Sequence, residues 1–470
     1  NVTHSIEAVM IQFLRISLIC LFSITAFSKE IKFKTRKDEI VSISFSEISG
    51  NKSFTQSSDQ QVTPASVLKI FSMAYALDTL GSDFTFKTKV YYQGKLVGDT
   101  LQGDLYLVGD GDPYLNHPQL VNLALAVSKR GIKKVTGSLY YDNSLFPQID
   151  ALSKLGLGDQ TYNPGVGALN SEFNRLSIWT SSRPPLSIIP GMPLEIKEAK
   201  SGFMPTQDFR WNDTKAESWW LRKGAKLSIR TDLPIRNPGM WTANLLSHHL
   251  QSFGIEVQSI ENKNLPSNVQ LISTEESLPL WSLSTLTMEY SNNLLAEAIA
   301  LRACSRAKVR PLNQQTCADK ISKSVNSKKP PKFHNASGLS INNELTARDS
   351  TYFLKKNFSK SWRNHTLLSL LSYSGQSGWI RNRLSSPGYN LRLFAKTGSL
   401  DFVNNIAGYI RTRTNTWYSF TLFHTEDKKR EALSKVNPKN LQSLKNQASS
   451  WRKSSLDRTD NFLKEFIDNN

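Results

Sequence analysis

The sequence predicts an α+β protein in which a large β-rich region interrupts a domain of helices and antiparallel strands. Three observations support this prediction. An alternating strand pattern and a punctuated helix open the chain, many short strand-like runs fill its middle, and a helical stretch with three apolar strands lies near its end. Consecutive strands of this kind usually pair antiparallel.

Composition limits the class of protein. The 470 residues correspond to roughly three domains of ~150 residues, or to one large elaborated domain. With 39% hydrophobic and 21% charged residues, the chain is typical of a globular protein that buries a sizeable core. The formal net charge of +19 favours a polyanionic neighbour, such as nucleic acid, an anionic membrane face or an acidic cell-wall polymer.

Residues 1–28 have the pattern of a secretory signal that follows an upstream extension of the reading frame. Arg15 precedes an apolar run, residues 16–27, and Ala26-Phe27-Ser28 fits a small-x-small cleavage rule. The run is too short for a membrane-spanning helix, which needs ~20 residues. We therefore expect a periplasmic or secreted protein without a transmembrane anchor. Lipidation is not expected, because Cys20 follows Ile19 instead of a small residue.

Two cysteines remain once the signal is removed, Cys304 and Cys317. An even count in an exported chain favours one disulfide, and two independent thiols are the alternative. Neither the cysteines nor the seven histidines show the spacing of a metal site, so no metal or other cofactor is expected.

The N-terminal part contains a strand and then a helix. Alternating residues 41–48 predict the strand. The helix follows from Thr63, a candidate cap, through Pro64 in its first turn, to Gly81, which closes it. Short strand-like runs with turn residues then extend from 88 to 257, interrupted by a helix-like piece.

The C-terminal part turns helical from about residue 278 and ends in three strands, over residues 390–398, 404–412 and 417–424. Beyond Thr425 the chain is polar and basic. We interpret this tail as a solvated, partly helical appendage.

Ser66 and Lys69 lie in the first turn of the predicted helix, where residues i and i+3 share one face. A hydroxyl can there meet an amine that acts as its base, beside the unpaired N–H groups of the helix start. The Ser-x-x-Lys spacing alone is weak evidence, because Ser305 and Ser450 begin the same pattern.

Two further motifs make the interpretation more specific. Ser291 and Asn293 follow a helical stretch, and Lys396-Thr397-Gly398 ends an apolar strand and occurs once. At a strand edge, backbone groups can pair with an extended peptide, a lysine can attract its carboxylate, and a glycine permits close approach. Taken singly, these motifs are better explained as a surface lysine, a turn glycine and capping serines, but this does not explain all three in this order and in these contexts.

Ser-x-x-Lys at a helix start, Ser-x-Asn, and Lys-Thr-Gly on a strand form the order found in penicillin-binding proteins and serine β-lactamases. In this chain 225 residues separate Ser66 from Ser291, and 105 separate Ser291 from Lys396. The long first gap, with stretches such as GDLYLVGDGDPYL and NASGLSINNELTARD, resembles the class C low-molecular-mass penicillin-binding proteins, the D-alanyl-D-alanine carboxypeptidase/endopeptidase family. The similarity extends from about residue 44 to residue 423.

This resemblance implies a serine β-lactamase/DD-peptidase-like domain in two parts, residues 29–90 and 261–470, with the tail from about 426. Between them it implies a β-rich insertion, residues 91–260, of two small subdomains. Peptidoglycan stem peptides would be the substrates, and β-lactams would bind to the same site.

The resemblance also implies residue roles. Ser66 would be the acylated nucleophile, Lys69 its base, and Ser291 the proton relay to the departing amine. The substrate would be held by Asn293, Lys396, Thr397, Gly398, Ser399 and, through a free amino group on its side chain, Asp142. The backbone N–H groups of Ser66 and Ser399 would hold the oxyanion.

The sequence departs from the family pattern at Ser399, where a threonine is frequent, and at two positions that bear on substrate recognition. Ile341 stands where an arginine is usual, and Asn335 stands where an aspartate is usual. A pocket that binds an acidic group of the substrate in the family is therefore expected to be altered in this chain.

Three other functions are weighed against this one. A serine β-lactamase shares the three motifs but seldom carries so large an insertion. A catalytically silent wall-binding relative would have lost a serine or lysine, and none is lost here. A nucleic-acid binder would explain the charge, but the chain has an export signal and no recognisable nucleic-acid motif. We therefore expect no nucleic acid, and a peripheral association with an acidic surface through the positive charge.

Overall fold

The computed structural model describes residues 31–154, 159–204, 207–212, 216–327, 330–435 and 438–470. The predicted secretory signal lies outside these residues. Among the helices of the described ranges, none has the length and apolar character needed to cross a bilayer.

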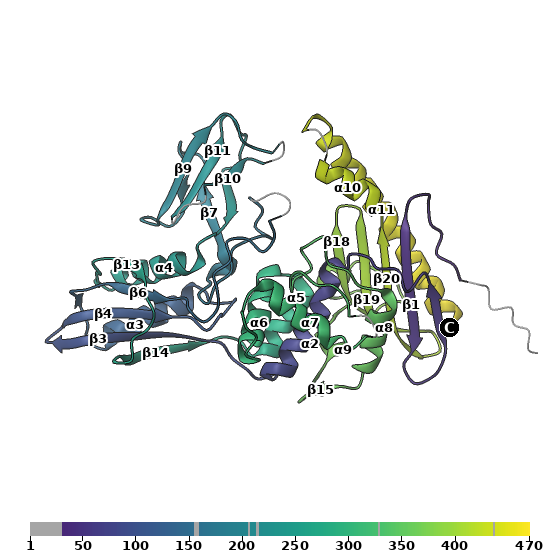
Figure 1. Ribbon diagram of the computed structural model, residues 1–470, viewed down its shortest axis with the longest axis horizontal. Coiled ribbons are helices and arrows are strands. Elements are labelled where there is room, and N and C mark those ends of the chain that lie inside the picture. Colours follow the sequence, from purple (N-terminus) through teal and green to yellow (C-terminus); the bar gives the residue numbers. More distant parts are fainter. Residues whose placement is uncertain (1–30, 155–158, 205–206, 213–215, 328–329, 436–437) are drawn as a thin grey trace, which may run out of the picture.

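One domain is built on an antiparallel sheet of six strands in the order β17-β18-β19-β20-β1-β2 (Figure 1). The alternation at 41–48 forms β1, and the three C-terminal apolar runs form β18, β19 and β20, so the predicted antiparallel arrangement is confirmed. The strands are β1 (Ile40–Glu47), β2 (Ser53–Gln56), β17 (Ser372–Tyr373), β18 (Leu393–Leu400), β19 (Val403–Arg411) and β20 (Trp417–Thr425).

Helices cover one face of this sheet and form the larger core of the domain. Ala407 and Tyr409 of β19 point into that core, where they meet apolar side chains of the surrounding helices. These elements are the 3₁₀ turn η1 (Ala65–Leu68), α2 (Lys69–Leu80), α5 (Leu280–Tyr290), α6 (Asn293–Arg306), α7 (Gln314–Ser324), α8 (Ala347–Lys356) and α9 (Leu367–Leu370). The predicted disulfide is confirmed between Cys304 and Cys317, with an S–S distance of 2.01 Å.

The helix predicted from Thr63 begins differently from the expectation. Pro64 occupies the cap position without a side-chain hydrogen bond, so Thr63 does not cap the helix. The Thr63 carbonyl instead accepts a hydrogen bond of 2.8 Å from Asn405 of β19. This contact connects the turn that carries Ser66 to the sheet. Gly81 closes the helix with φ +88, as predicted.

The opposite face of the sheet is covered by α11 (Pro438–Asn469), which follows α10 (Asp427–Lys435). Ile406 and Ile410 of β19 face it, in a core completed by Phe462, Leu463, Phe466 and Ile467. These four side chains are at most 4% exposed. The interpretation of the tail as a solvated appendage is therefore wrong, because its last helix is part of the domain's structural core.

The region between α2 and α5 has a core of its own. Its main sheet has the order β13-β6-β4-β3-β14, with β5 beside β4, and α3 (His117–Lys129) packs against α4 (Pro238–Ser252) over it. The strands are β3 (Lys87–Val97), β4 (Thr100–Val108), β5 (Lys134–Val135), β6 (Leu139–Asp142), β13 (Ile260–Asn262) and β14 (Gln270–Glu276). Because β3 and β14 pair at its edge, this sheet extends beyond residues 91–260; the predicted division into domains stays a prediction.

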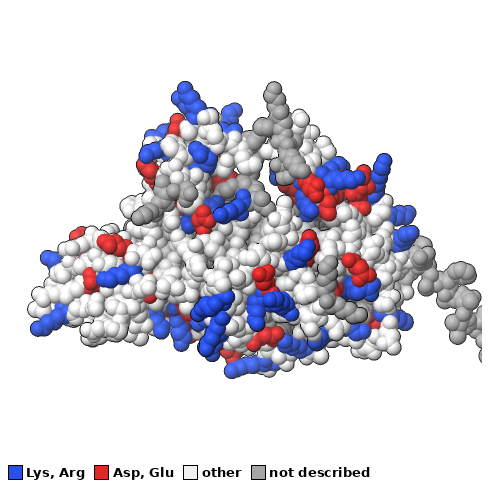
Figure 2. All heavy atoms as spheres, viewed as in Figure 1, with Lys and Arg blue, Asp and Glu red and all other residues white. Residues whose placement is uncertain are grey.

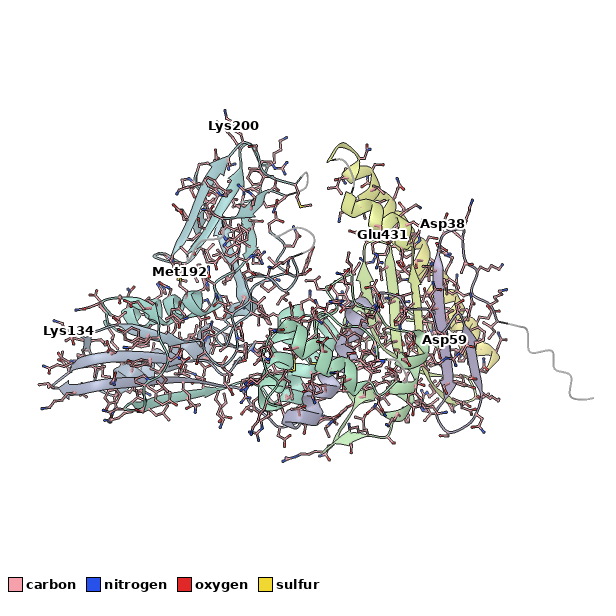
Figure 3. All side chains as sticks on the ribbon, viewed as in Figure 1. Asp38, Asp59, Lys134, Met192, Lys200 and Glu431 are labelled. Atoms are coloured by element: carbon pink, nitrogen blue, oxygen red, sulfur yellow. A yellow bond between two sulfur atoms is a disulfide. The ribbon has the colours of Figure 1, made fainter. Side chains whose placement is uncertain are left out.

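Two three-stranded sheets rise above this region, β10-β11-β9 and β12-β7-β8 (Figure 1). Met192, labelled in Figure 3, lies beneath them and is buried in the shared core. Their strands are β7 (Arg175–Trp179), β8 (Leu186–Ser187), β9 (Leu194–Ala199), β10 (Phe209–Trp211), β11 (Glu217–Arg222) and β12 (Arg230–Pro234).

Candidate active site

Ser66 and Lys69 lie on one face of the turn that leads from η1 into α2. The Lys69 amine nitrogen is 3.0 Å from the Ser66 hydroxyl oxygen. Ser66 is partly exposed, whereas Lys69 is fully buried. The helical spacing predicted this contact, and the structure provides it.

The surroundings of Lys69 favour a neutral amine. Burial is the main cause that moves the pKa of Lys69 well below its ordinary value, and the charge of Lys396 acts in the same direction, while Glu297 opposes both. The Lys69 amine contacts the Asn293 side-chain oxygen and the Ser337 carbonyl, each at 2.6 Å. A neutral amine has two N–H groups for these acceptors and a lone pair left for the Ser66 hydroxyl proton.

Ser291 and Asn293 occupy the junction between α5 and α6. Ser291 ends α5 in the left-handed conformation, with φ +55, and this turns its side chain out of the helix direction. Asn293 begins α6, and its side-chain nitrogen donates a 2.9 Å hydrogen bond to the carbonyl of Tyr162, from the inserted region. The carboxamide therefore connects Lys69 with a loop of the inserted region.

Lys396 comes to the same place from β18 and is 1% exposed. Its amine donates hydrogen bonds of 2.9 Å to the Ser291 hydroxyl and to the Thr397 carbonyl. Burial lowers the pKa of Lys396 to about 7. Each buried lysine therefore contacts a different serine, and Glu297 acts on Lys69 only through its charge, without a direct hydrogen bond to the amine in the described part of the chain.

The β18 strand passes very close to the turn that carries Ser66. A Cβ atom at Gly398 would lie 2.5 Å from the Pro64 carbonyl oxygen and 3.2 Å from the Ser66 nitrogen. Strand β17 pairs only with Phe394 and Ala395. On that side, the described residues offer no strand partner to β18 from Lys396 onward, where Thr397 and Ser399 lie, so an extended peptide can be added there.

Sequence reasoning assigned no role to Glu297 or to the loop at Gly338, which both shape the site. Glu297 lies one helical turn after Asn293, is 1% exposed, and accepts hydrogen bonds from the backbone nitrogens of Ala336 and Ser337. Gly338, with φ +80, lets this loop pack on the Ala65 carbonyl. The i, i+4 spacing of Asn293 and Glu297 was the available signal; the contribution of the loop depends on tertiary packing.

Asn335 and Ile341, two residues at which the sequence departs from the family pattern, differ in their surroundings. Asn335 is buried and its side-chain oxygen accepts hydrogen bonds from the Gly338 nitrogen, at 3.2 Å, and from the Asn343 side chain, at 3.0 Å. Ile341 is 36% exposed. The asparagine therefore supports the turn at Gly338, and the isoleucine presents an apolar side chain on the surface.

Asp142 lies at the end of β6, apart from these contacts. Its two carboxylate oxygens accept hydrogen bonds from the backbone nitrogens of Ser144, at 2.9 Å, and Leu265, at 2.8 Å. These bonds are typical of an aspartate that stabilises turns. A role of Asp142 toward the substrate stays a prediction.

The arrangement supplies the parts of nucleophilic acyl transfer: a hydroxyl, a neutral amine beside it, a second hydroxyl beside a second amine, and an open strand edge. In the ranges that the structure describes, no three side chains of the metal-binding kinds come together as a metal site.

A family model described as D-Ala-D-Ala carboxypeptidase 3 (S13) family matches residues 38–180 and 223–445. The chain is 26% identical over 388 residues to D-alanyl-D-alanine carboxypeptidase DacB of Haemophilus influenzae, covering 76% of this chain and 79% of that protein. It is 23% identical over 407 residues to a D-alanyl-D-alanine carboxypeptidase of an Actinomadura species, covering 77% of this chain and 73% of that protein.

Solved structures show the same fold. The crystal structure of penicillin-binding protein 4 (dacB) from Haemophilus influenzae matches with a TM-score of 0.71 and 24% identity, over 85% of this chain and 93% of that one. The Bd0816 predatory endopeptidase from Bdellovibrio bacteriovorus matches with a TM-score of 0.53 and 14% identity, over 91% and 94%. The predicted fold class is therefore confirmed.

Proposed function

Since the chain belongs to the D-Ala-D-Ala carboxypeptidase 3 (S13) family, we propose that it is a serine D-alanyl-D-alanine carboxypeptidase that also acts as an endopeptidase on peptidoglycan stem peptides. The motif resemblance to class C low-molecular-mass penicillin-binding proteins is thereby confirmed. The observation that carries the proposal is the 3.0 Å contact between Ser66 and a buried Lys69 whose pKa is lowered.

In the first step, neutral Lys69 takes the proton of Ser66 while the serine oxygen attacks the carbonyl between two D-alanine residues. The backbone N–H groups of Ser66 and Ser399 hold the oxyanion. Removing one such donor costs ~10²–10³ in rate. The close approach of β18 to Ser66 at Gly398 supports this pairing of donors from two segments.

As the tetrahedral intermediate collapses, Ser291 passes its proton to the departing amine and takes up the proton that Lys69 received from Ser66, so D-alanine leaves and Lys69 is neutral again. Lys396 supports this role because its amine contacts the Ser291 hydroxyl. Protonated Lys396, with Thr397, receives the terminal carboxylate of the substrate. Water then hydrolyses the acyl-enzyme and restores Ser66.

Endopeptidase activity uses the same steps with a larger leaving group. A crosslink between D-alanine and a side-chain amine presents the same carbonyl to Ser66, and the open edge of β18 accommodates an extended chain. β-Lactams acylate Ser66 because they present a strained amide in the same position. The structure of the Haemophilus protein complexed with a β-lactam supports this step for the present chain.

A fluorescent penicillin tests the proposal. Wild-type protein is expected to retain the label on Ser66, and the Ser66→Ala variant is expected to take none. A serine β-lactamase would take the label and lose it quickly, and a silent wall-binding relative would never take it. Release of D-alanine from a stem pentapeptide, measured by chromatography, then separates hydrolysis from mere binding.

Lys69→Arg supplies the matched variant for the base. Arginine is a basic side chain of similar length, but it stays protonated in proteins, so unlike neutral Lys69 it cannot accept the serine proton. We expect labelling to fall by at least ~10²-fold, the typical contribution of a general base. Wild-type labelling of this variant would remove Lys69 from the mechanism.

Export to the periplasm or cell exterior follows from residues 1–28 and from the wall substrate. N-terminal sequencing of the protein from its native cells is expected to begin near Lys29, after the small-x-small site at Ala26-Phe27-Ser28. An uncleaved N-terminus in the cytosolic fraction would contradict export.

A further inference from the structure

The sheet β12-β7-β8 of the inserted region has one buried and one exposed face. Leu176 and Ile178 of β7 are buried in the region's core. Trp179, the next residue, points to the opposite face and is 47% exposed. It is paired directly with Leu186 of β8 and Arg230 of β12. Because directly paired residues share a face, these three side chains stand side by side toward solvent.

Apolar exposure continues around the tryptophan. Leu186 is 58% exposed, Ile188 is 43% exposed and Ile229, which precedes Arg230, is 66% exposed. The backbone nitrogen of Ile188 donates to the Ser177 carbonyl, and this bond places it beside β7. Contiguous apolar exposure on a soluble protein indicates a binding surface. We call Trp179, Leu186, Ile188 and their paired neighbours on β12 the tryptophan face.

Polar side chains on the same face are held in a hydrogen-bonded row. Arg230 donates to the Ser177 hydroxyl at 2.9 Å, and Ser177 donates to Asp232 at 2.6 Å. Arg175 contacts the same carboxylate at 3.5 Å. The row fixes donors and acceptors beside the indole ring in one flat surface, and such preorganisation lowers the cost of binding.

The charge around the face is positive. Arg175 and Arg230 are exposed on this face and Arg183 is exposed in the turn between β7 and β8, against the carboxylates of Asp232 and Glu198. Figure 2 shows Lys and Arg side chains on the same upper lobe, with Asp and Glu side chains among them, and Lys200, labelled in Figure 3, lies at its tip. An aromatic ring between aliphatic groups and arginines fits a ligand with flat apolar faces, hydroxyls and carboxylates.

We propose that the tryptophan face binds peptide-free glycan strands of peptidoglycan, an amino-sugar polymer whose carboxylates are free once the stem peptides have been removed, outside the catalytic site. The indole of Trp179 lies against a sugar ring, and Arg230 and Arg175 pair with carboxylates. This rests on the proposed function, since that function brings the chain to this polymer. Trp179 and Arg230 lie within the residues that the family model matches, whereas Leu186 and Ile188 of the same face lie outside them.

The test uses full-length protein whose Ser66 is blocked with penicillin, and glycan strands from which an amidase has removed the stem peptides. The cleft is then filled and its peptide substrate is absent, so binding reports on another surface. We expect wild-type protein to bind these strands and Trp179→Ala to bind at least tenfold more weakly. Arg230→Ala is expected to reduce both the affinity and its dependence on salt.

Tyr352→Ala is the matched control, because Tyr352 is an aromatic residue of the helix α8 with 54% exposure. It is expected to bind like wild type. Leu186→Asn is a second variant that removes apolar contact while the indole remains. Labelling of Ser66 by fluorescent penicillin verifies that every variant is folded. In the wild-type protein it also separates the two ideas: absence of labelling contradicts the proposed function, whereas labelled wild-type protein that does not bind strands contradicts the role of the tryptophan face.

Three results overturn the proposal. One is equal binding of strands by wild-type and Trp179→Ala protein. Another is equal weakening by Trp179→Ala and Tyr352→Ala. The third is evidence for a different occupant of the face. This would be a dimer that wild-type protein forms and Trp179→Ala protein does not, or binding to anionic lipid vesicles that depends on Trp179 while strands are not bound.

Discussion

The amine nitrogen of Lys396 lies 2.9 Å from the hydroxyl oxygen of Ser291, although 105 residues separate them in the chain. Lys69 lies at the same kind of distance from Ser66. Two buried amines thus face two hydroxyls, and the charge on one affects the other, because Lys396 lowers the pKa of Lys69. In the proposed mechanism, this pairing divides the proton transfers between two lysines.

The pKa of Lys396, lowered to about 7 by burial, predicts the pH dependence of catalysis. Below pH 7 the amine is protonated and attracts a substrate carboxylate; above it the charge is lost. The kcat/KM for a peptide ending in D-alanine is therefore expected to fall up to about tenfold per pH unit above pH 7. Stopped assays from pH 5 to pH 10 measure it.

Two comparisons test this explanation. Lys396→Arg keeps its charge throughout the range, so the fall above pH 7 is expected to disappear even if the overall rate is lower. A peptide substrate whose terminal carboxylate is replaced by an amide is expected to show no fall in kcat/KM above pH 7 with the wild-type protein. A wild-type profile that stays flat to pH 10 would contradict the assignment.

Gly398→Ala is expected to block acylation. The added Cβ would lie 2.5 Å from the Pro64 carbonyl and 3.2 Å from the Ser66 nitrogen, so β18 must move away from the turn that carries Ser66. Such a shift removes an oxyanion donor, and we expect penicillin labelling to slow by ~10²–10³-fold. Gly131→Ala strains an open turn at φ +86 with no atom nearby, and it is expected to lower stability without changing the labelling rate.

The sequence allowed prediction of those parts of the molecule in which local pattern and geometry agree. Helical spacing brings Ser66 to Lys69, and strand alternation forms β1 and β18 to β20. The buried Glu297 and the loop at Gly338 were missed because their contribution comes from packing between distant segments. No spacing rule indicates which carbonyl a buried amine will meet.

The C-terminal helix shows a different reason for failure. Its many charged residues suggested a solvated tail, yet Phe462, Leu463, Phe466 and Ile467 form a narrow apolar stripe that the sheet buries.

Leu463→Ala is expected to lower the free energy of unfolding by about 2–5 kcal/mol, as for other fully buried leucines. Urea denaturation measures it. Lys464→Ala, one residue further along, is the control and is expected to change stability by less than about 0.5 kcal/mol.

A buried ionic cluster joins the same helix to the sheet and predicts how stability depends on pH. His424 of β20 is fully buried between Ser455, whose hydroxyl lies 2.6 Å from Nδ1, and Glu39, whose carboxylate lies 3.3 Å from Nε2. Arg458 and Trp451 of α11 also bind the Glu39 carboxylate. Burial lowers the pKa of His424 to about 4 from 6.5.

The sign of the effect follows from proton uptake. Between pH 6.5 and pH 4 the unfolded chain binds a proton at this histidine and the folded chain does not, so the contribution of His424 to stability is complete above pH 6.5 and is lost as the pH falls. The pKa difference corresponds to about 3 kcal/mol. The raised pKa values of Asp112 and Glu217, both about 7 through burial, act in the opposite sense over the same range.

Because the contributions of His424, Asp112 and Glu217 to the pH dependence of stability overlap, the effect of His424 is measured as a difference between wild type and a His424 variant. The free energy of unfolding of wild type minus that of His424→Asn, from urea denaturation at several pH values, is expected to decrease by about 3 kcal/mol from pH 7 to pH 4. Nuclear magnetic resonance of wild type gives a second measurement that does not require the variant to fold. The imidazole signals of His424 should stay unchanged from pH 7.5 to pH 5, whereas titration near pH 6.5 would show that the ring is charged within the cluster.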